Sequence, residues 1–325
     1  MGEKNNERQK QHFVPKGYLN NFSISRKGTL WQYDKKEQKL SPKKPVSSKS
    51  VCQHEYYYYQ HDEEGNIDHI TIEKETEKVD TKGLNIINRM LSVPQNQSIE
   101  ITAERQDILA FFLAFLLTRN PCVRDGINQS YGTAAEILSK ILQDQGKYPP
   151  LPEGLSPDIM EKIRLEIFAE VSLRPMVIMA EQIALSMMKK CWFLLRAQAN
   201  SYYVTSDNPV SFDFPYSSYG MNMGPSHPLS EISIPLGERL AIIITPFPKQ
   251  GFSCKISTLV ASRELNQLIN WRTIRSAARY VYSPYQSNQL LSSIKKAHGM
   301  GQKVVCNLPE TRRIKILDHP YLNLK

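Results

Sequence analysis

A short run of strand-forming residues, Tyr202–Val210, ends in a polar turn that presents a carboxylate. Its β-branched residues favour a strand, and the Ser-Asp-Asn-Pro sequence that follows favours a turn because these side chains bond to their own backbone. The upstream run Cys191–Arg196 predicts a partner strand, so we expect the two runs to form a β-hairpin with Asp207 at its rim. Asp207 there either binds a cation or serves the turn alone.

The segment Ile72–Leu91 predicts a helix with acidic residues on the face that its second half must bury. Glu73, Glu77 and Asp80 share this face with apolar residues spaced three or four positions apart. Acidic residues in a first turn also complement the helix dipole, which is the structural alternative. Glu77 and Asp80 lie beyond the first turn, and carboxylates are ligands that Mg²⁺ prefers at phosphate-processing sites. We therefore expect Glu73, Glu77, Asp80 and Asp207 to bind Mg²⁺ or Mn²⁺.

Two further residues, His12 and Arg119, have the chemistry to act on a phosphate substrate. The apolar helix from Arg105 to Thr118, with Thr102 as its N-cap, is expected to be central and buried, and Arg119 follows its last turn. Arg119 either satisfies the terminal carbonyl groups or binds a phosphate or a carboxylate. His12 lies among apolar and aromatic residues, where a histidine is either structural or a general acid or base.

The net charge of +9 is concentrated near the end of the chain. Residues 251–325 contain 12 Lys and Arg against 3 Asp and Glu, whereas the first 250 residues contain 29 of each kind. A helix capped by Ser262 and running to about Arg279 places Arg272, Arg275 and Arg279 in a basic stripe. This stripe either binds the phosphates of a nucleic acid or is a solvated helix face.

Length and composition indicate a folded cytoplasmic protein. The 325 residues are 41% hydrophobic and 22% charged, and no apolar run is long enough to cross a membrane. The first residues are polar and resemble no secretory signal, so we expect a cytoplasmic location without membrane association. The odd number and wide spacing of the cysteines favour reduced thiols over disulfides or a zinc site. They are Cys52, Cys122, Cys191, Cys254 and Cys306.

The expected elements give an α+β fold. We expect strands at 29–34, 55–59, 231–235, 240–245, 252–258, 280–283 and 303–306, with a hairpin turn at 62–68. Further helices are expected at 133–143 and at 156–190, the latter broken at Arg174-Pro175, with a short helix ending at Gly299. Segments 35–49, 146–154 and 213–230 are expected to be an exposed basic loop, a lid or hinge, and a flap.

These elements predict one compact domain over residues 1–325. Its expected parts are an N-terminal strand region at 1–70, a buried helical middle at 71–190, and a C-terminal mainly antiparallel sheet with flanking helices at 191–325.

The order of these landmarks resembles the bacterial domain-of-unknown-function family 4238. The resemblance rests on a His-x-x-Pro-x-x-Tyr-Leu-x-x-Phe opening, an Ile-Glu helix start, an Arg-x-Pro sequence after the apolar helix, and Ser-Asp-Asn-Pro after a Trp-led strand. The matching residues are His12, Pro15, Tyr18, Leu19, Phe22, Ile72, Glu73, Arg119, Asn120, Pro121, Trp192 and Ser206–Pro209. The family brings no established activity. The resemblance implies that His12, Glu73, Arg119 and Asp207 belong to one recurring pattern.

Two hypotheses for function follow. In the first, the protein is a metal-dependent phosphodiesterase or nuclease: Glu73, Glu77 and Asp207 hold the cation, His12 is the general acid or base, and Arg119 binds the phosphate. In the second, the protein is non-catalytic: these residues form a buried structural network, and the basic end binds nucleic acid or a partner protein. The first hypothesis requires the side chains to converge in a cleft.

Overall fold

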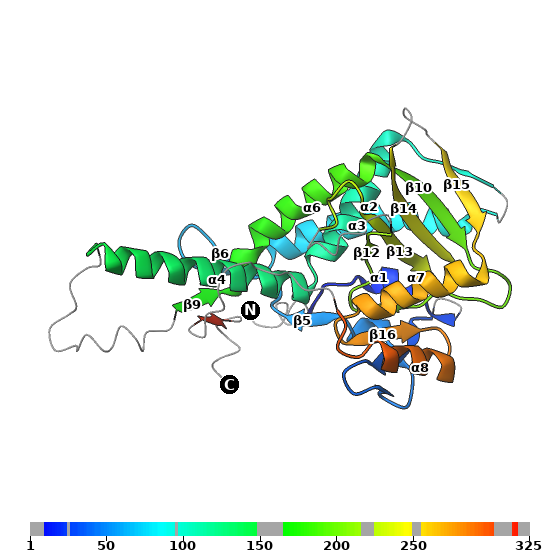
Figure 1. Cartoon of the computed structure of the whole chain (residues 1–325), viewed down its shortest axis with the longest axis horizontal. Helices are drawn as coiled ribbons and strands as arrows, with labels where there is room; N and C mark the ends of the chain where they lie inside the picture. The colour runs from blue at the N-terminus through cyan, green and yellow to red at the C-terminus, as the bar shows by residue number, and fades with distance from the viewer. Residues whose placement is uncertain are drawn as a thin grey trace, which may run out of the picture.

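The computed structural model describes residues 10–24, 27–94, 97–147, 165–215, 224–248, 255–301 and 314–317. The chain combines helices with mainly antiparallel sheets, which confirms the predicted α+β class (Figure 1). Among the described helices, none combines the length and the apolar character that a membrane crossing requires.

The larger sheet has six strands in the order β12-β13-β14-β10-β15-β8. Their bounds are β12 Ser211–Asp213, β13 Glu231–Gly237, β14 Leu240–Pro248, β10 Lys190–Arg196, β15 Lys255–Val260 and β8 Ile99–Glu100. All neighbours are antiparallel except β10 and β15. The predicted central position of 240–245 is confirmed, because β14 lies between β13 and β10.

A smaller antiparallel sheet pairs strands from distant parts of the sequence. Its strands are β11 Thr205–Ser206, β16 Tyr280–Ser283, β2 Thr29–Asp34, β3 Lys39–Leu40 and β4 Val46–Ser47. β2 pairs with β16, although about 250 residues separate them in the sequence. Strands from the predicted N-terminal and C-terminal regions therefore form one sheet.

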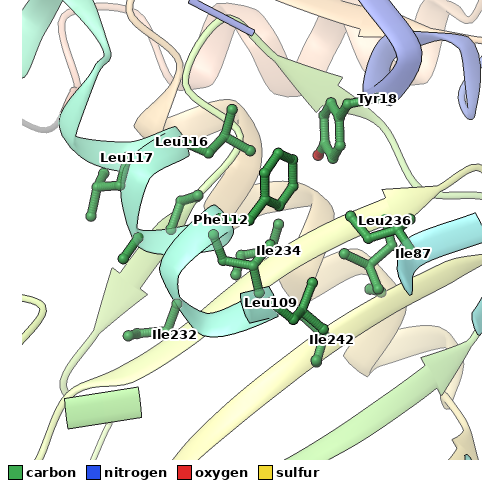
Figure 2. Packing of buried hydrophobic residues seen from close by; sticks show 14 of the residues in the cluster. Tyr18, Ile87, Leu109, Phe112, Leu116, Leu117, Ile232, Ile234, Leu236 and Ile242 are labelled. Atoms are coloured by element: carbon green, nitrogen blue, oxygen red, sulfur yellow. The ribbon is translucent and has the colours of Figure 1, made fainter. Parts of the chain in front are cut away.

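Two helices pack against an apolar helix, α3 (Ala103–Thr118). Both α2 (Thr71–Ser92) and α6 (Leu173–Met188) lie against α3, and Figure 2 shows Phe112 of α3 near Tyr18 and Ile234. The helices approach closely at Gly83 of α2, where a Cβ atom would come within 2.2 Å of the Phe112 ring. The predicted burial of this helix and its Thr102 N-cap are confirmed.

The other elements surround these layers. The helices are α1 Lys16–Asn20, α4 Pro121–Asp144, α7 Arg263–Ser276 and α8 Asn288–Lys296, with 3₁₀ turns at Ser48–Ser50 and Ala169–Ser172. Three strand pairs complete the described elements: β1 Lys10–His12 with β5 Gln53–Glu55, β6 Gln60–His61 with β7 Ile67–Asp68, and β9 Leu165–Phe168 with β17 Ile314–Leu317. Figure 1 shows α4 extending to the left, away from the larger sheet, whereas α7 and α8 lie below that sheet at the right. The hairpin turn predicted at 62–68 is confirmed by β6 and β7.

The predicted hairpin of Cys191–Arg196 with Tyr202–Val210 is wrong. Strand β10 pairs with β14 and β15 in the larger sheet, whereas β11 pairs with β16 in the smaller one. The intervening chain follows the β13–β14 turn instead, because the Ala197 N–H donates to the Arg239 carbonyl and the Tyr203 N–H to that of Glu238. The run of strand-forming residues therefore crosses from one sheet to the other.

Four other predicted boundaries also need correction. Residues 56–59 form a turn, which Tyr56 begins at a φ of 51°. The helix predicted at 133–143 begins at Pro121, because Asn120 accepts from the Cys122 N–H and Pro121 lacks an N–H to satisfy. Residues 165–168 are strand β9, and α6 begins at Leu173, so Pro175 occupies a first turn. Helix α7 ends at Ser276.

Several predictions fall on residues outside the described part of the chain. These are the strand at 303–306, residues 148–154 of the lid or hinge, the start of the 156–190 helix, and residues 216–223 of the flap. Cys254 and Cys306 also lie outside it, while Cys52, Cys122 and Cys191 are free thiols, as expected.

Candidate functional site

The buried carboxylate of Asp207 binds the backbone that follows α7. Its two oxygens accept from the N–H groups of Ala278 at 2.9 Å, Arg279 at 2.8 Å and Tyr280 at 2.8 Å. The Asp207 N–H in turn donates to the Tyr280 carbonyl at 3.0 Å. Three consecutive amides therefore turn toward one side chain, which explains why α7 ends at Ser276 and does not continue to Arg279.

Lys35 lies beside this carboxylate and caps the same helix. Its buried ammonium donates to the carbonyls of Arg275 at 2.8 Å, Ala277 at 2.9 Å and Met300 at 2.7 Å. Burial raises the pKa of Asp207 to about 6, against the opposing effects of the three amides and Lys35. Burial lowers the pKa of Lys35 to about 8, with Asp207 opposing the change. The prediction of an exposed basic loop at 35–49 is therefore wrong for Lys35.

Arg119 forms a paired contact with one of the predicted metal ligands, Asp80. The two guanidinium nitrogens lie 2.8 Å and 3.2 Å from the two Asp80 oxygens. Arg119 is fully buried, and its guanidinium lies 5.2 Å from the centroid of the Phe115 ring. Burial raises the pKa of Asp80 although Arg119 opposes the rise. The Asp80 carboxylate is thus already neutralised by a buried cation.

His12 and Glu73 join this pair around Tyr58. The Tyr58 hydroxyl donates to the His12 carbonyl at 3.1 Å. Burial raises the pKa of Tyr58, and the charges of Asp80 and Glu73 add to the rise while Arg119 opposes it. Burial also lowers the pKa of His12, and the charge of Arg119 acts in the same direction. The charges of Arg119, Asp80 and Glu73 therefore act on one buried phenol, whereas His12 contacts it through its backbone carbonyl.

Glu77 and Asp207 do not complete this cluster. Glu77 is exposed on α2, where its charge raises the pKa of Asp80, and Asp207 is bound to the backbone after α7. Among the described residues, no group of three or more His, Cys, Asp or Glu side chains is placed to hold a metal ion.

The segments that carry the family resemblance contact one another in the interior. The Asn120 side chain donates to the Asp207 carbonyl. The Tyr18 hydroxyl donates to the Pro235 carbonyl at 2.6 Å and lies 3.2 Å from the Thr205 hydroxyl. These hydrogen bonds join Tyr18 of α1, the residue Asn120 after the end of α3, and both sheets.

The predicted basic stripe is neutralised by neighbouring carboxylates. Arg272 pairs with Glu231 at 2.6 Å, Arg275 with Asp213 at 3.0 Å, and Arg279 with Asp34 at 2.9 Å. Arg272 is also buried, and Arg279 lies beyond the end of α7. The three arginines do not form one continuous exposed helix face.

The opposite face of α7 lines a pocket that the sequence reasoning missed. This α7–α8 pocket has a volume of about 380 Å³. From α7 it is lined by Arg263, Asn266, Gln267, Asn270, Trp271 and Ile274. From α8 and the chain before β11 it is lined by Ser287, Gln289, Leu290, Ser293, Lys296, Asn200, Ser201, Tyr202 and Val204. The three-four spacing of the α7 residues is the sequence signal that identifies this face.

Among its described lining residues, the α7–α8 pocket carries two cations and no carboxylate. Neither Arg263 nor Lys296 forms an ion pair with a described acid. Asn270 fixes the chain on one side, because its side chain accepts from the Val204 N–H at 3.0 Å and donates to the Tyr202 carbonyl at 2.8 Å. The pocket therefore presents positive charge, amides and hydroxyls beside the rings of Tyr202 and Trp271.

Comparison with protein families identifies the chain. The model of the family described as "Protein of unknown function (DUF4238)" matches residues 10–287, and the chain belongs to this family. A search of curated proteins and a search of solved structures find no match.

Proposed function

We propose that this protein is a non-catalytic nucleic-acid-binding protein that holds single-stranded nucleic acid in the α7–α8 pocket. The observation that carries the proposal is the acid-free lining of this pocket, which combines two cations with two aromatic rings. Proteins that bind single strands use cationic side chains along the phosphates and aromatic side chains for base stacking.

Each part of the pocket has a role in this proposal. Arg263 and Lys296 contact phosphates from the start of α7 and the end of α8. Trp271 and Tyr202 provide surfaces for stacking bases. The amides of α7 and the serine hydroxyls of α8 have donors and acceptors for base edges and sugars.

The contacts of the predicted catalytic residues support a structural role for them. Asp207 uses both oxygens to accept backbone amides, and Asp80 is paired with the buried Arg119. A buried charge that loses its partner is strongly destabilising, so such pairs hold the fold even when they perform no chemistry.

Binding to fluorescein-labelled single-stranded DNA and RNA tests the proposal. The double variant Arg263→Gln/Lys296→Gln should bind more weakly, with a salt dependence reduced by about 1.4 in the slope of log K against log salt for two lost phosphate contacts. Trp271→Ala should lose about 1–3 kcal/mol of binding free energy through lost stacking. Arg275→Gln, on another face of α7, is the matched control and should bind as wild type does.

Two outcomes would end the proposal. One is a wild-type protein that fails to bind either single strand at low salt. The other is a double variant that retains the wild-type affinity and salt slope.

The metal-dependent phosphodiesterase remains the alternative. The observation that favours it is the placement of His12, Glu73 and Asp80 around Arg119. Titration calorimetry with Mg²⁺ and Mn²⁺ tests it, with Glu73→Gln as the variant, Glu77→Gln as the control outside the cluster, and a nuclease assay as a second readout. Cation binding that Glu73→Gln abolishes and Glu77→Gln retains, together with metal-dependent cleavage, would favour the phosphodiesterase.

A further inference from the structure

A cavity of about 720 Å³ lies among α2, α3 and α6, away from the α7–α8 pocket. We propose that it binds a long-chain carboxylic acid, with the hydrocarbon chain inside and the carboxylate at the rim. Its volume lies within the range of about 300–1,000 Å³ that is usual for ligand sites. This inference is independent of the nucleic-acid proposal, because the two sites share no lining residue.

The arrangement of the three helices creates the cavity. Helix α3 packs against both α2 and α6, and the cavity lies beside α3 between these two helices. Phe111 and Phe115 of α3 line this space with stacked rings, 5.8 Å between centroids and inclined by 9°. Parallel rings present a flat apolar surface, along which an extended hydrocarbon chain packs well.

The walls beside these rings are also apolar. The side chains that line them come from the first half of α2 and the start of α6: Ile72, Val79, Leu173, Met176, Val177 and Ile178. Val177 is 37% exposed and Ile178 is 47% exposed. These two residues place apolar surface where the cavity meets solvent, which suits the entry of a hydrocarbon chain.

The charges at the rim select a carboxylate. Glu75 is paired with Lys78 at 2.6 Å, and Glu170 accepts from the backbone N–H of His61 at 2.6 Å and lies 2.8 Å from its imidazole. This leaves Lys82 of α2 and Arg174 of α6, neither of which pairs with a carboxylate among the described residues. With Lys78, Lys82 and Arg174 against Glu75 and Glu170, the lining carries a net positive charge, complementary to an acid head group.

Calorimetry with octanoate, decanoate and dodecanoate, each below its micellar concentration, tests the length dependence. The affinity should rise about fourfold with each added methylene group, as expected when each group leaves water for an apolar cavity. Dodecanol and dodecyltrimethylammonium are the head-group controls, and both should bind at least about tenfold more weakly than dodecanoate if the rim selects the acid. Equal affinities for the three acids, or for the three head groups, would overturn the proposal.

Two substitutions on one helix locate the site. Val177→Asp places a charge on the cavity wall and should weaken dodecanoate binding by at least about tenfold, because burying an apolar chain against a carboxylate is unfavourable. Leu185→Asp is the matched control, since Leu185 is 54% exposed on the same helix and does not line the cavity. Equal losses in both variants, or no loss in Val177→Asp, would place binding elsewhere.

A second pair of variants tests the rim. Lys82→Gln/Arg174→Gln should remove the preference for dodecanoate over dodecanol, while Arg89→Gln on α2, which does not line the cavity, should retain it. These cations are exposed, so the variants should fold as wild type does. A preference that survives the double substitution would show that the rim cations do not bind the head group.

Discussion

At the scale of single residues, a buried charge in this protein is tied to the backbone or to an opposite charge. Asp207 accepts three amide N–H groups, and Lys35 donates to two carbonyls at the end of α7 and to the Met300 carbonyl after α8. The two side chains together satisfy the backbone groups that the end of α7 leaves open. Asp207 therefore holds a segment of backbone about 70 residues away in the sequence, which is more than the expected alternative that it serves its own turn alone.

The pH dependence of the Asp207→Asn variant tests this role. The pKa of Asp207 is about 6 in the fold and 3.8 in the unfolded chain, so between these values the folded state binds more protons. The contribution of this group to the free energy of unfolding is therefore greatest below pH 4 and falls as the pH rises to 6. Asparagine does not titrate, so the destabilisation that it causes should shrink by about 2–3 kcal/mol between pH 4 and pH 7.

Urea unfolding of wild type and Asp207→Asn at pH 4 and pH 7 measures this difference. The control is Asp213→Asn, which changes a partly exposed carboxylate. Asn208→Asp does not serve as a control, because the Asn208 side chain is also buried. A difference between wild type and Asp207→Asn that stays constant over this range would contradict the prediction.

At the scale of elements, the two faces of α7 have different roles. One face holds Arg272 and Arg275 against the acids of β12 and β13, and so fixes the helix to the edge of the larger sheet. The other face lines the α7–α8 pocket with residues spaced for one side of a helix. A count of charges along the sequence does not separate these arginines. Their burial and their ion-pair partners in the fold distinguish Arg272 and Arg275, which anchor the helix, from Arg263, which lines the pocket.

The anchoring role predicts unequal effects for two neighbouring arginines. Arg272→Met should destabilise the fold by about 3–5 kcal/mol, because it leaves Glu231 buried without its cation. Arg275→Met should cost less than about 1 kcal/mol, because both its side chain and that of Asp213 are more than a third exposed. Urea unfolding at neutral pH compares them, and similar losses in the two variants would contradict the anchoring role of Arg272.

At the scale of the whole molecule, the sequence predicted those features that depend on neighbouring residues, such as the N-caps of helices. Thr102 and Ser262 cap helices as expected, because an N-cap bonds to an amide only three residues away. The hairpin prediction failed because β11 finds its partner in β16, far along the chain, and no local signal specifies that pairing. The same limit applies to the predicted site. The sequence shows which residues have functional side chains, but the partners of Asp207 and Arg272 come from distant segments, which no local signal identifies.

The fold joins its two sheets closely enough that we expect the chain to unfold as one unit. One hydrophobic cluster includes Leu30 of β2 and Ile242 of β14, which belong to different sheets. The Glu238 N–H also donates to the Asn21 carbonyl at 2.9 Å, between the turn after β13 and the end of α1. Disruption of either sheet exposes apolar surface that the other one covers.

Single-tryptophan variants report on the two sheets separately. Trp31 lies on β2 of the smaller sheet and Trp192 on β10 of the larger one. With the other two tryptophans replaced by phenylalanine, each variant should have one urea midpoint, the same by fluorescence as by circular dichroism, because one cooperative unit loses all its structure together. Each variant is its own control, since circular dichroism reports the whole chain. If the Trp31 signal changed at lower urea than the ellipticity while the Trp192 signal did not, the smaller sheet would be a separate unit and the single-domain prediction would fail.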